Sequence, residues 1–302
     1  MSCEAKHKEV VHIVAGSDSK YAPHLAVMLC SLASTNSDLD FKAHIVHDGI
    51  YQSYREQVES SVPSMKFEWH DMANHRVLNF SSLLHISRAT YLRLAILDVL
   101  PNDVHRVLYL DVDVIVLGSI RELWEMNLEN CACAAVPDPG VDPDEFAKKW
   151  NLPASKWYFN AGVMLIDLDT LRTNNSLQTA IDALEKKSNI CEFADQDALN
   201  IALWNQWKHI SPVWNFQRKF LYDNFVKWNE LQHILRKPVI IHFTEEYKPW
   251  RNSEWHPWSW MYLCFLIRTP FKNVVLKNGN ISVLDRIKWL LRWHIKRPKI
   301  LR

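Results

Sequence analysis

Residues 106–120, RVLYLDVDVIVLGSI, place two aspartates inside a nearly continuous run of Val, Leu, Ile and Tyr. Such a run predicts a strand buried on both faces, where burial alone disfavours carboxylates. Side chains two positions apart on a strand point the same way, so Asp111 and Asp113 can converge on one divalent cation if the strand ends or kinks at Asp111. The alternative is a pair of aspartates that caps a turn. The β-branched neighbours favour the metal site over the turn.

Outward from this stretch, apolar runs typical of strands alternate with segments of helical apolar spacing. The expected strands are residues 10–15, 41–47, 65–69, 132–136, 157–168 and 238–243, and the expected helices include residues 21–33, 52–60, 87–97 and 198–203. This alternation predicts an α/β fold with a mostly parallel, doubly wound sheet and helices on both faces. Ligands of such folds bind at the carboxyl ends of strands, where Asp111 and a polar loop at residues 16–19 are expected.

The composition indicates a globular chain. A length of 302 residues with 48% apolar side chains supports one large α/β domain with an appendage, or two modest domains. The six cysteines show no zinc-site spacing, so buried free thiols are expected. Residues 1–14 carry charges where a signal peptide has an apolar region, and the apolar run 261–267 is too short to span a bilayer. These features predict a cytoplasmic protein.

The net charge of +1 is unevenly distributed along the chain. Residues 281–302 hold seven basic residues and one acidic residue, and their apolar side chains recur at helical spacing at Leu284, Ile287, Leu291 and Ile295. We expect an amphipathic helix that docks on an anionic membrane surface, where each cation contributes about 1 kcal/mol. The alternatives are a helix packed on the domain and a nucleic-acid tail. Interleaved Trp and Leu favour a peripheral position on the inner face of the membrane, with no nucleic-acid partner.

Polar residues at the ends of other predicted elements are further candidates. Asp138 lies in a turn after one expected strand, and Asn160 opens a small-residue turn where a ligand can approach the backbone closely. Asp195 and Gln196 open a helix, and their position alone would make them a cap and a surface residue.

A histidine at the end of an expected strand adds a nitrogen ligand to the two aspartates. His242 ends the apolar run 238–243, a position that more often belongs to a core or rim residue than to a ligand. Two carboxylates and one imidazole nevertheless suit Mn²⁺, and they suit Mg²⁺ less well. Lys248, six residues further on, could reach a phosphate of whatever the metal holds.

Five ordered segments together resemble family 8 glycosyltransferases, and among these the bacterial lipopolysaccharide glycosyltransferases. The segments are HISRATYLRL at 85–94, LYLDVDVIV at 108–116, YFNAGVMLIDL at 158–168, DQDALN at 195–200 and HFTEEYKPW at 242–250. The resemblance implies transfer of galactose or glucose from a UDP-sugar, with retention of configuration, to a saccharide or glycolipid acceptor. It also implies a GT-A-like catalytic domain at residues 8–250, which leaves residues 251–302 as a helical, basic, membrane-associating region.

The resemblance also assigns roles to individual residues. It implies that Asp111, Asp113 and His242 hold Mn²⁺ together with the diphosphate of the UDP-hexose. The other matching positions are Lys248 for the diphosphate, Arg93 near nucleotide and sugar, Ala15 and Tyr21 for uridine, Asp138, Asn160, Asp195 and Gln196 for the donor sugar, and His85 and Thr90 for acceptor or donor. Asp138, Asp195 and Gln196 are the catalytic candidates, with Gln196 near the anomeric carbon.

The retaining mechanism stays open between two routes. A double displacement would need Gln196, a poor nucleophile, or a movement of Asp195. Front-face attack, with Gln196 stabilising charge, is the route we favour. The alternative functions are a metal-dependent phosphohydrolase, which would want further carboxylates at the metal, and a non-catalytic sugar-nucleotide-binding protein.

Three segments differ from the family pattern or have two interpretations. The loop AGSDSKY at residues 15–21 is one residue longer than usual, and Glu245 and Glu246 stand close to the expected diphosphate, where many relatives have a glycine. The tryptophans at residues 250–260 are either platforms for an acceptor sugar or packing residues, and we expect packing.

Overall fold

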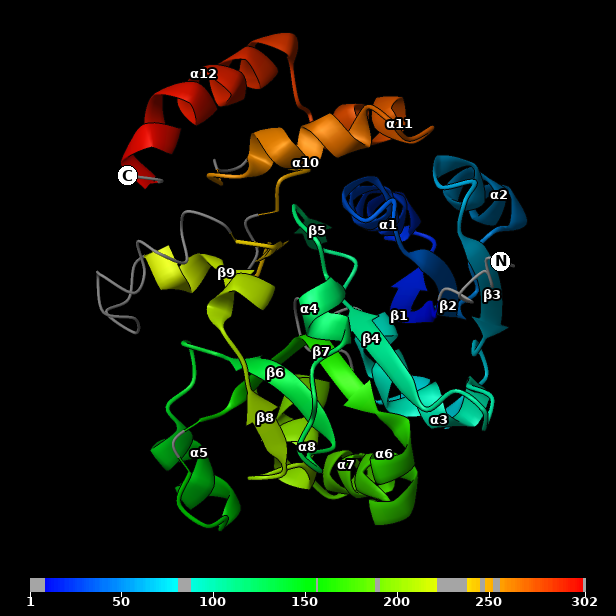
Figure 1. The fold of residues 1–302 in the computed structure, drawn as a ribbon, viewed down its shortest axis with the longest axis vertical. Coiled ribbons are helices and arrows are strands. Elements are labelled where there is room, and N and C mark those ends of the chain that lie inside the picture. Colours follow the sequence, from blue (N-terminus) through cyan, green and yellow to red (C-terminus); the bar gives the residue numbers. More distant parts are fainter. Residues whose placement is uncertain are drawn as a thin grey trace, which may run out of the picture.

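The protein is described here from a computed structural model that covers residues 9–80, 88–155, 157–187, 191–221, 238–244, 248–251 and 256–300. A seven-stranded sheet lies at its centre, in the order β3-β2-β1-β4-β7-β6-β8 (Figure 1). The strands are β1 (Val10–Asp18), β2 (Asp40–Asp48), β3 (Lys66–Asp71), β4 (Arg106–Leu110), β6 (Cys133–Pro137), β7 (Phe159–Asp167) and β8 (Trp207–His209). Neighbouring strands pair in parallel except at β7, which is antiparallel to β4 and β6. The prediction of a mostly parallel sheet is confirmed.

Side chains that alternate along the strands build a hydrophobic core on each face of the sheet. On β1, Val11, Ile13 and Ala15 belong to one buried cluster, and Val14 belongs to the other. The first cluster includes α1 (Ala22–Thr35), α2 (Gln52–Ser61) and α4 (Arg121–Trp124). The second includes η1 (Arg76–Asn79), η2 (Arg88–Ala95), α3 (Ile96–Val99), α5 (Pro143–Trp150), α6 (Leu168–Asn174), α7 (Ser176–Lys187) and α8 (Ala194–Ala202). Helices on both faces are therefore also confirmed.

The aspartate stretch crosses from the large sheet to a small one. Strand β4 ends at Leu110, residues 111–113 turn, and β5 (Val114–Val116) joins a three-stranded sheet of order β5-β10-β9. Its other strands are β9 (Phe216–Gln217) and β10 (Ile240–His242), and the 3₁₀ turns η4 (Pro212–Trp214) and η5 (Arg218–Leu221) flank β9. The strand thus ends directly before Asp111, as the metal interpretation required. The same two aspartates also lie in a turn.

Several element boundaries differ from the prediction. The first strand continues to Asp18, because residues 16–18 pair with residues 46–48 of β2, so the loop expected at residues 16–19 is mostly strand. The expected helix at residues 87–97 is instead the 3₁₀ segment η2 followed by the short helix α3. Helix α8 begins at Ala194, four residues earlier than expected.

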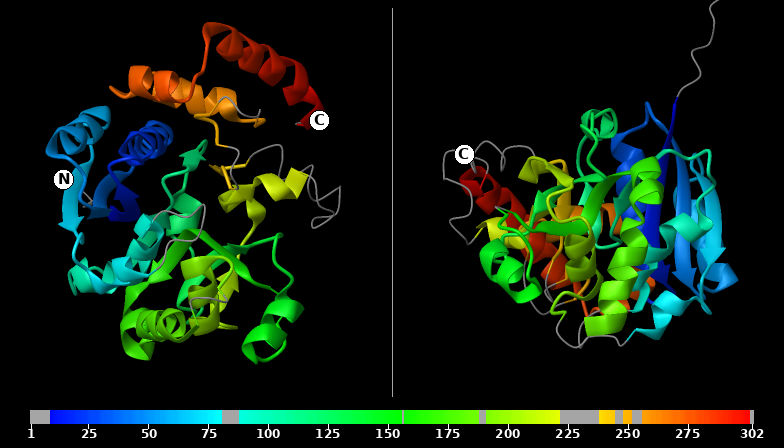
Figure 2. Two further views of the ribbon diagram at one scale, coloured as in Figure 1. Left: turned by 180° about the vertical axis from the view of Figure 1, so that it is seen from behind. Right: turned by 90° about the horizontal axis from the view of Figure 1, so that it is seen from below.

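The C-terminal region packs on α1 at one end of the molecule (Figures 1 and 2). It comprises α10 (Ser259–Leu266), α11 (Lys272–Asn278) and α12 (Val283–Ile300). Trp250 and Trp258 are buried in the same cluster as α1, so packing is confirmed for these two, while Trp255 lies outside the described residues. The His24 ring stacks on Trp250 at a centroid distance of 3.7 Å, and His24 Nδ1 is 2.7 Å from the Tyr262 hydroxyl.

The apolar face predicted for the last helix is exposed in the structure. Leu284, Ile287, Leu291 and Ile295 of α12 are 46–69% exposed, whereas Trp289 is buried against the core. The side chain of Trp293 lies outside the described residues. Among the described helices, none combines the length and the apolarity that a membrane-spanning helix needs.

Candidate metal and substrate site

Two carboxylates and one imidazole converge where the two sheets meet. Asp111 and Asp113 come from the turn after β4, and His242 ends β10, the strand that pairs with β5. His242 Nε2 is 3.1 Å from Asp113 Oδ1 and 3.8 Å from Asp111 Oδ2. The three potential ligand atoms lie within 4.8 Å of one another, so one metal ion could contact all three. The structure therefore brings together the three residues that the sequence analysis grouped.

Gly162 provides the space beside this cluster. A Cβ atom built on Gly162 would collide with the His242 ring and would lie 2.8 Å from Asp111 Oδ2. The Gly162 carbonyl also accepts a 2.8 Å hydrogen bond from the Asp111 backbone, so β7 holds the end of β4 at this point. A close approach of this kind requires a residue without a side chain.

A buried asparagine orients the imidazole. Asn215 Nδ2 donates to Asn160 Oδ1 at 2.9 Å, which places Asn215 Oδ1 2.9 Å from His242 Nδ1. Because that oxygen can only accept, Nδ1 donates, and the Nε2 lone pair faces the two carboxylates. Three groups with lone pairs directed at one point suit a bound cation, and a hydrogen bond that fixes the tautomer is typical of a metal-ligating histidine.

Arg93 balances the buried negative charge. Its guanidinium is 3.1 Å from Asp111 Oδ1 and 2.5 Å from Asp195 Oδ2, and it donates to the Ala161 carbonyl at 2.6 Å. Burial lowers the pKa of Arg93, but the charges of Asp111 and then Asp195 outweigh burial and raise it, so the arginine stays charged. Arg93 thereby ties η2 to both the metal cluster and α8.

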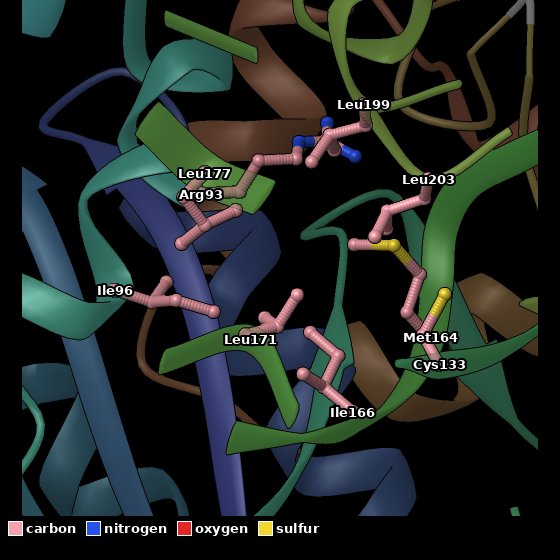
Figure 3. A pocket seen from close by; sticks show the side chains of 9 residues that line it. All are labelled: Arg93, Ile96, Cys133, Met164, Ile166, Leu171, Leu177, Leu199 and Leu203. Atoms are coloured by element: carbon pink, nitrogen blue, oxygen red, sulfur yellow. The ribbon is translucent and has the colours of Figure 1, made fainter. Parts of the chain in front are cut away.

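The charged groups lie in a region of low polarity. Arg93 borders a small cavity whose other lining residues are apolar, including Met164, Leu199 and Leu203 (Figure 3). Burial raises the pKa of Asp195 to about 6, despite the opposing charge of Arg93. Burial also raises the pKa of Tyr109 well above its usual value, so its hydroxyl stays protonated and donates to Asp111 Oδ1 at 2.9 Å.

A chain of amide hydrogen bonds joins the metal cluster to α8. Asn160 Nδ2 and Gln196 Nε2 both donate to Asp138 Oδ2, at 3.0 and 3.1 Å, and Gln196 Oε1 accepts from the Ala161 backbone at 3.0 Å. Asn160 Oδ1 in turn accepts from Asn215. Three predicted residues, from the turn after β6, from β7 and from α8, are therefore brought together, and their polar atoms are held in fixed directions.

Lys248 contacts the oxygen of Asp113 that does not face His242. Its ammonium is 2.7 Å from Asp113 Oδ2 and donates to the Phe243 carbonyl at 2.6 Å. Burial tends to raise the pKa of Asp113, but the charge of Lys248, together with the contact with His242, outweighs burial and lowers the pKa, so Asp113 is ionised. One of the carboxylates is therefore available as an anionic ligand at neutral pH.

Asp195 does not cap its helix. No side-chain hydrogen bond caps α8, and Asp195 faces Arg93. Asp197 instead accepts from the backbone of Glu192 and Phe193 and from the Tyr158 hydroxyl. The cap interpretation of Asp195 was wrong because the buried arginine offers a stronger partner than the backbone does.

The remaining candidates lie at varying distances from the cluster. Ala15 is buried in β1, and Tyr21 precedes α1 and packs edge-on against Trp250. Burial, and after it the charge of Asp113, raises the pKa of Tyr21. Thr90 Oγ1 accepts from Arg93 at 3.0 Å. His85, Glu245 and Glu246 lie outside the described residues.

Sequence reasoning missed Asn215 and Tyr109. Asn215 is a fully buried amide inside the apolar run PVWNF, and a polar residue in such a run is the signal that could have identified it. Tyr109 lies two positions before Asp111 and reads as an ordinary strand residue. Its contacts with Asp111 and with the Arg93 guanidinium, which lies 4.9 Å from its ring centroid, appear only in the structure.

Comparison with known sequences places the chain among glycosyltransferases. The chain belongs to glycosyl transferase family 8, whose sequence model matches residues 12–254. General stress protein A of Bacillus subtilis (strain 168) is 28% identical over 279 residues, which cover 88% of this chain and 96% of that protein. Lipopolysaccharide 1,2-glucosyltransferase of Escherichia coli (strain K12) is 25% identical over 295 residues, which cover 95% of this chain and 87% of that protein.

Solved structures of glycosyltransferases share the fold. The galactosyltransferase LgtC, crystallised with donor and acceptor sugar analogs, superposes with a TM-score of 0.75 at 23% identity, over 86% of this chain and 96% of that chain. The glycosyltransferase GlyE of Streptococcus pneumoniae TIGR4 superposes with a TM-score of 0.61 at 22% identity, over 97% of this chain and 64% of that chain. These likenesses show that the chain has the fold of such enzymes.

Proposed function

We propose that the protein is a Mn²⁺-dependent retaining glycosyltransferase that moves galactose or glucose from a UDP-sugar to a saccharide acceptor of the lipopolysaccharide or glycolipid class. The observation that carries the proposal is the convergence of Asp111, Asp113 and His242 beside the fixed amides of Asn160 and Gln196. The acceptor class rests on the named activity of the Escherichia coli relative.

The donor set suits Mn²⁺ because it combines carboxylate oxygens with one imidazole nitrogen. Asp111, Asp113 and His242 would hold the ion, and Gly162 leaves the space that it needs. A bound divalent ion supplies positive charge that stabilises the departing diphosphate. In this proposal Lys248, now 2.7 Å from Asp113 Oδ2, adds a second positive charge for the diphosphate. Ala15 and Tyr21 line the uridine position.

The hydrogen bonds favour front-face attack over double displacement. Gln196 uses its oxygen for the Ala161 amide and its nitrogen for Asp138, so its polar atoms are occupied. Asp195 is paired with Arg93 and is 2% exposed, so it would have to break a buried ion pair to act as a nucleophile. We propose that Gln196 stabilises positive charge at the anomeric carbon, while the leaving phosphate oxygen takes the proton of the acceptor.

Slow donor hydrolysis tests the activity without a known acceptor. The purified chain is incubated with a panel of UDP-sugars and Mn²⁺, and UDP release is measured. We expect release from one UDP-hexose only, and its loss in Asp113→Asn. The absence of release from every donor by a folded chain would contradict the proposal, and phosphate release from simple esters would indicate a phosphohydrolase.

A Gln196→Ala variant tests the mechanism. We expect slower UDP release with nearly unchanged UDP affinity. Gln196 contacts Asp138 and Ala161 at the proposed position of the sugar, whereas Lys248 is the residue proposed to bind the diphosphate. A covalent glycosyl adduct on Asp195 or Gln196, detected by mass spectrometry, would contradict front-face attack.

We further propose that residues 8–250 form the catalytic unit and that the region 251–302 holds the enzyme at an anionic membrane surface. The support is the exposed apolar stripe of α12, which lies beside the exposed Lys288 and Arg292. A helix that merely packed on the domain would bury its apolar side chains, and four of them are exposed instead. The proposed place of the protein is the cytoplasmic face of the membrane.

Liposome binding tests the membrane proposal. Ile287→Ser with Leu291→Ser leaves the buried Trp289 in place, so the domain should stay folded. We expect this variant to bind anionic liposomes about tenfold more weakly while it hydrolyses donor normally. Val274→Ser, at a partly exposed apolar position of α11, is the matched control and should bind normally. Equal binding by the two variants would contradict the role of α12.

A further inference from the structure

A second group of potential metal ligands lies at the far edge of the large sheet. His44 of β2 pairs in register with Glu68 of β3, and His70 follows two positions later on β3. Side chains two apart on a strand share a face, so all three project from the same face of the sheet. That face carries Val14 and Val46, which pack in the second hydrophobic cluster. None of these three residues belongs to the cluster at Asp111.

The donor atoms have the spacing of a small coordination shell. His44 Nδ1 is 3.1 Å from Glu68 Oε2 and 3.5 Å from His70 Nε2, and His70 Nε2 is 3.9 Å from Glu68 Oε2. Around a tetrahedral Zn²⁺ with bonds of about 2.0–2.2 Å, ligand atoms lie about 3.3–3.5 Å apart. Shifts of a few tenths of an ångström would therefore close the shell.

The outer hydrogen bonds orient two of the three ligands. His12 Nδ1 of β1 is 2.9 Å from His44 Nε2, so one nitrogen of His44 is engaged and the other faces Glu68. Lys42 is 2.6 Å from Glu68 Oε1, which leaves Oε2 directed at the histidines. A metal-ligating histidine usually has a partner of this kind on its other nitrogen. His44 is fully buried, whereas the Glu68 side chain is 38% exposed, so solvent reaches the site.

We propose that His44, Glu68 and His70 form a second metal site, selective for Zn²⁺, with water as the fourth ligand. Two imidazoles and one carboxylate are a donor set that Zn²⁺ uses with an open position. Mn²⁺, which prefers more oxygen ligands, belongs at the other cluster. The bound zinc joins β3, the edge strand of the sheet, to β2, and so stabilises the pairing of these two strands.

Zinc binding by a variant that lacks the other site tests this proposal. The full chain with Asp111→Asn and Asp113→Asn is stripped with a chelator and titrated with Zn²⁺ by calorimetry, and a parallel sample takes up Co²⁺. We expect one tight equivalent of Zn²⁺ and the intense visible absorption of tetrahedral Co²⁺. No zinc binding, or the weak absorption of octahedral Co²⁺, would overturn the proposal.

Ligand variants in the same background locate the site. His70→Gln and Glu68→Gln change partly exposed side chains, and each should weaken zinc binding at least about tenfold. His12→Ala, which removes only the outer hydrogen bond, should weaken it about 10–100-fold. His105→Gln changes an exposed histidine elsewhere and is the matched control. Equal zinc affinity of the His70 and His105 variants would overturn the assignment.

If the double aspartate variant does not fold, the test is made in a chain that keeps Asp111 and Asp113. Total bound zinc is then counted by elemental analysis after gel filtration. His70→Gln should lose one equivalent relative to His105→Gln, and zinc should raise the melting temperature of the control more than that of His70→Gln. Equal counts in the two variants would overturn the proposal.

Discussion

A single glycine decides whether the metal cluster has room. The Cα of Gly162 lies so close to His242 and Asp111 that no side chain fits between them. In the sequence this glycine was visible only as part of a small-residue turn. Its role depends on β10, which arrives from a distant part of the chain, so the sequence alone could not reveal the contact.

Gly162→Ala should therefore weaken metal binding more than it weakens folding. The added methyl group displaces the His242 ring, and we expect Mn²⁺ affinity to fall at least about tenfold, or about 1.4 kcal/mol. Calorimetric Mn²⁺ titration measures this change. Gly118→Ala is the matched control, because its Cβ would meet Val239 at an ordinary 3.5 Å. A normal Mn²⁺ affinity in Gly162→Ala would contradict the steric role.

Asn215 acts through His242, so its removal should affect the metal before the sugar. Without the acceptor on Nδ1, the imidazole loses its fixed tautomer, and we expect Mn²⁺ affinity to fall about 10–100-fold in Asn215→Ala. Asn215→Asp keeps an acceptor for His242 and should recover part of the loss. If the two variants lose the same affinity, the orienting role is wrong.

At the scale of elements, Asn200 joins α8 to β7. Its side chain accepts from the Phe159 amide at 2.8 Å and donates to the Phe159 carbonyl at 2.9 Å, as a neighbouring strand would. The residue is fully buried. This pair of hydrogen bonds fixes the position of Gln196, four residues earlier on the helix, relative to the start of β7.

Asn200→Ala should consequently lower both stability and activity. It leaves two buried backbone groups unpaired, and each such group costs about 1–3 kcal/mol. Chemical denaturation should show a loss of about 2–4 kcal/mol, and UDP release should slow because Gln196 moves. Gln178→Ala, at an exposed site of α7, should stay within about 0.5 kcal/mol of the parent chain. A stability equal to that of the control would contradict this role.

The strands were easier to predict than the helices around the site. Apolar runs at β1, β2, β4, β6 and β7 mark buried strands, and the structure has each of them within a few residues. The segment η2 misled the prediction, because ArgAlaThrTyrLeuArgLeuAla has helical apolar spacing while its Arg93 must reach Asp111 and Asp195. That requirement is tertiary and leaves no mark in the local pattern.

At the scale of the whole molecule, buried histidines make the fold sensitive to acid. Burial lowers the pKa of His24 to about 3 and that of His256 to about 3. In the unfolded chain such groups bind protons near pH 6.5, whereas the folded chain does not bind them until well below pH 5. The contribution of these neutral histidines to the unfolding free energy should therefore be largest above pH 6.5 and should decrease as the pH drops toward 4.

His24→Phe should reduce this acid sensitivity. The phenyl ring can keep the stack on Trp250, and it takes up no proton, so one of the proton-linked contributions disappears. We expect the loss of unfolding free energy between pH 6.5 and pH 4.5 to shrink by about 1–3 kcal/mol relative to the parent chain. Urea titrations at the two pH values measure it. An unchanged loss would mean that His24 takes up its proton without unfolding.

The candidate metal ligands could be predicted from the sequence, because their residue types and their order along the chain carry the signal. Asp111, Asp113 and His242 were grouped from their chemistry and the resemblance, and the structure brings them together. The contacts of Tyr109 and Gly162 could not be predicted, because they form only where β4, β7 and β10 meet. For Asn215, just before β9, the sequence offers only the signal of a polar residue in an apolar run. The division of the chain at residue 250 stays a prediction.

The small sheet has a consequence for how the protein is made. Its central strand, β10, leaves the ribosome last, after both neighbours, β5 and β9. Asp113 and Lys248 are 135 positions apart, and at about 5–20 residues per second the ribosome needs about 7–27 s to cover that distance. Until β10 is made, late in this interval, β5 lacks the strand it pairs with and the aspartates lack His242. A nascent chain stopped before residue 240 would therefore expose strand edges, and it would lack a complete metal site.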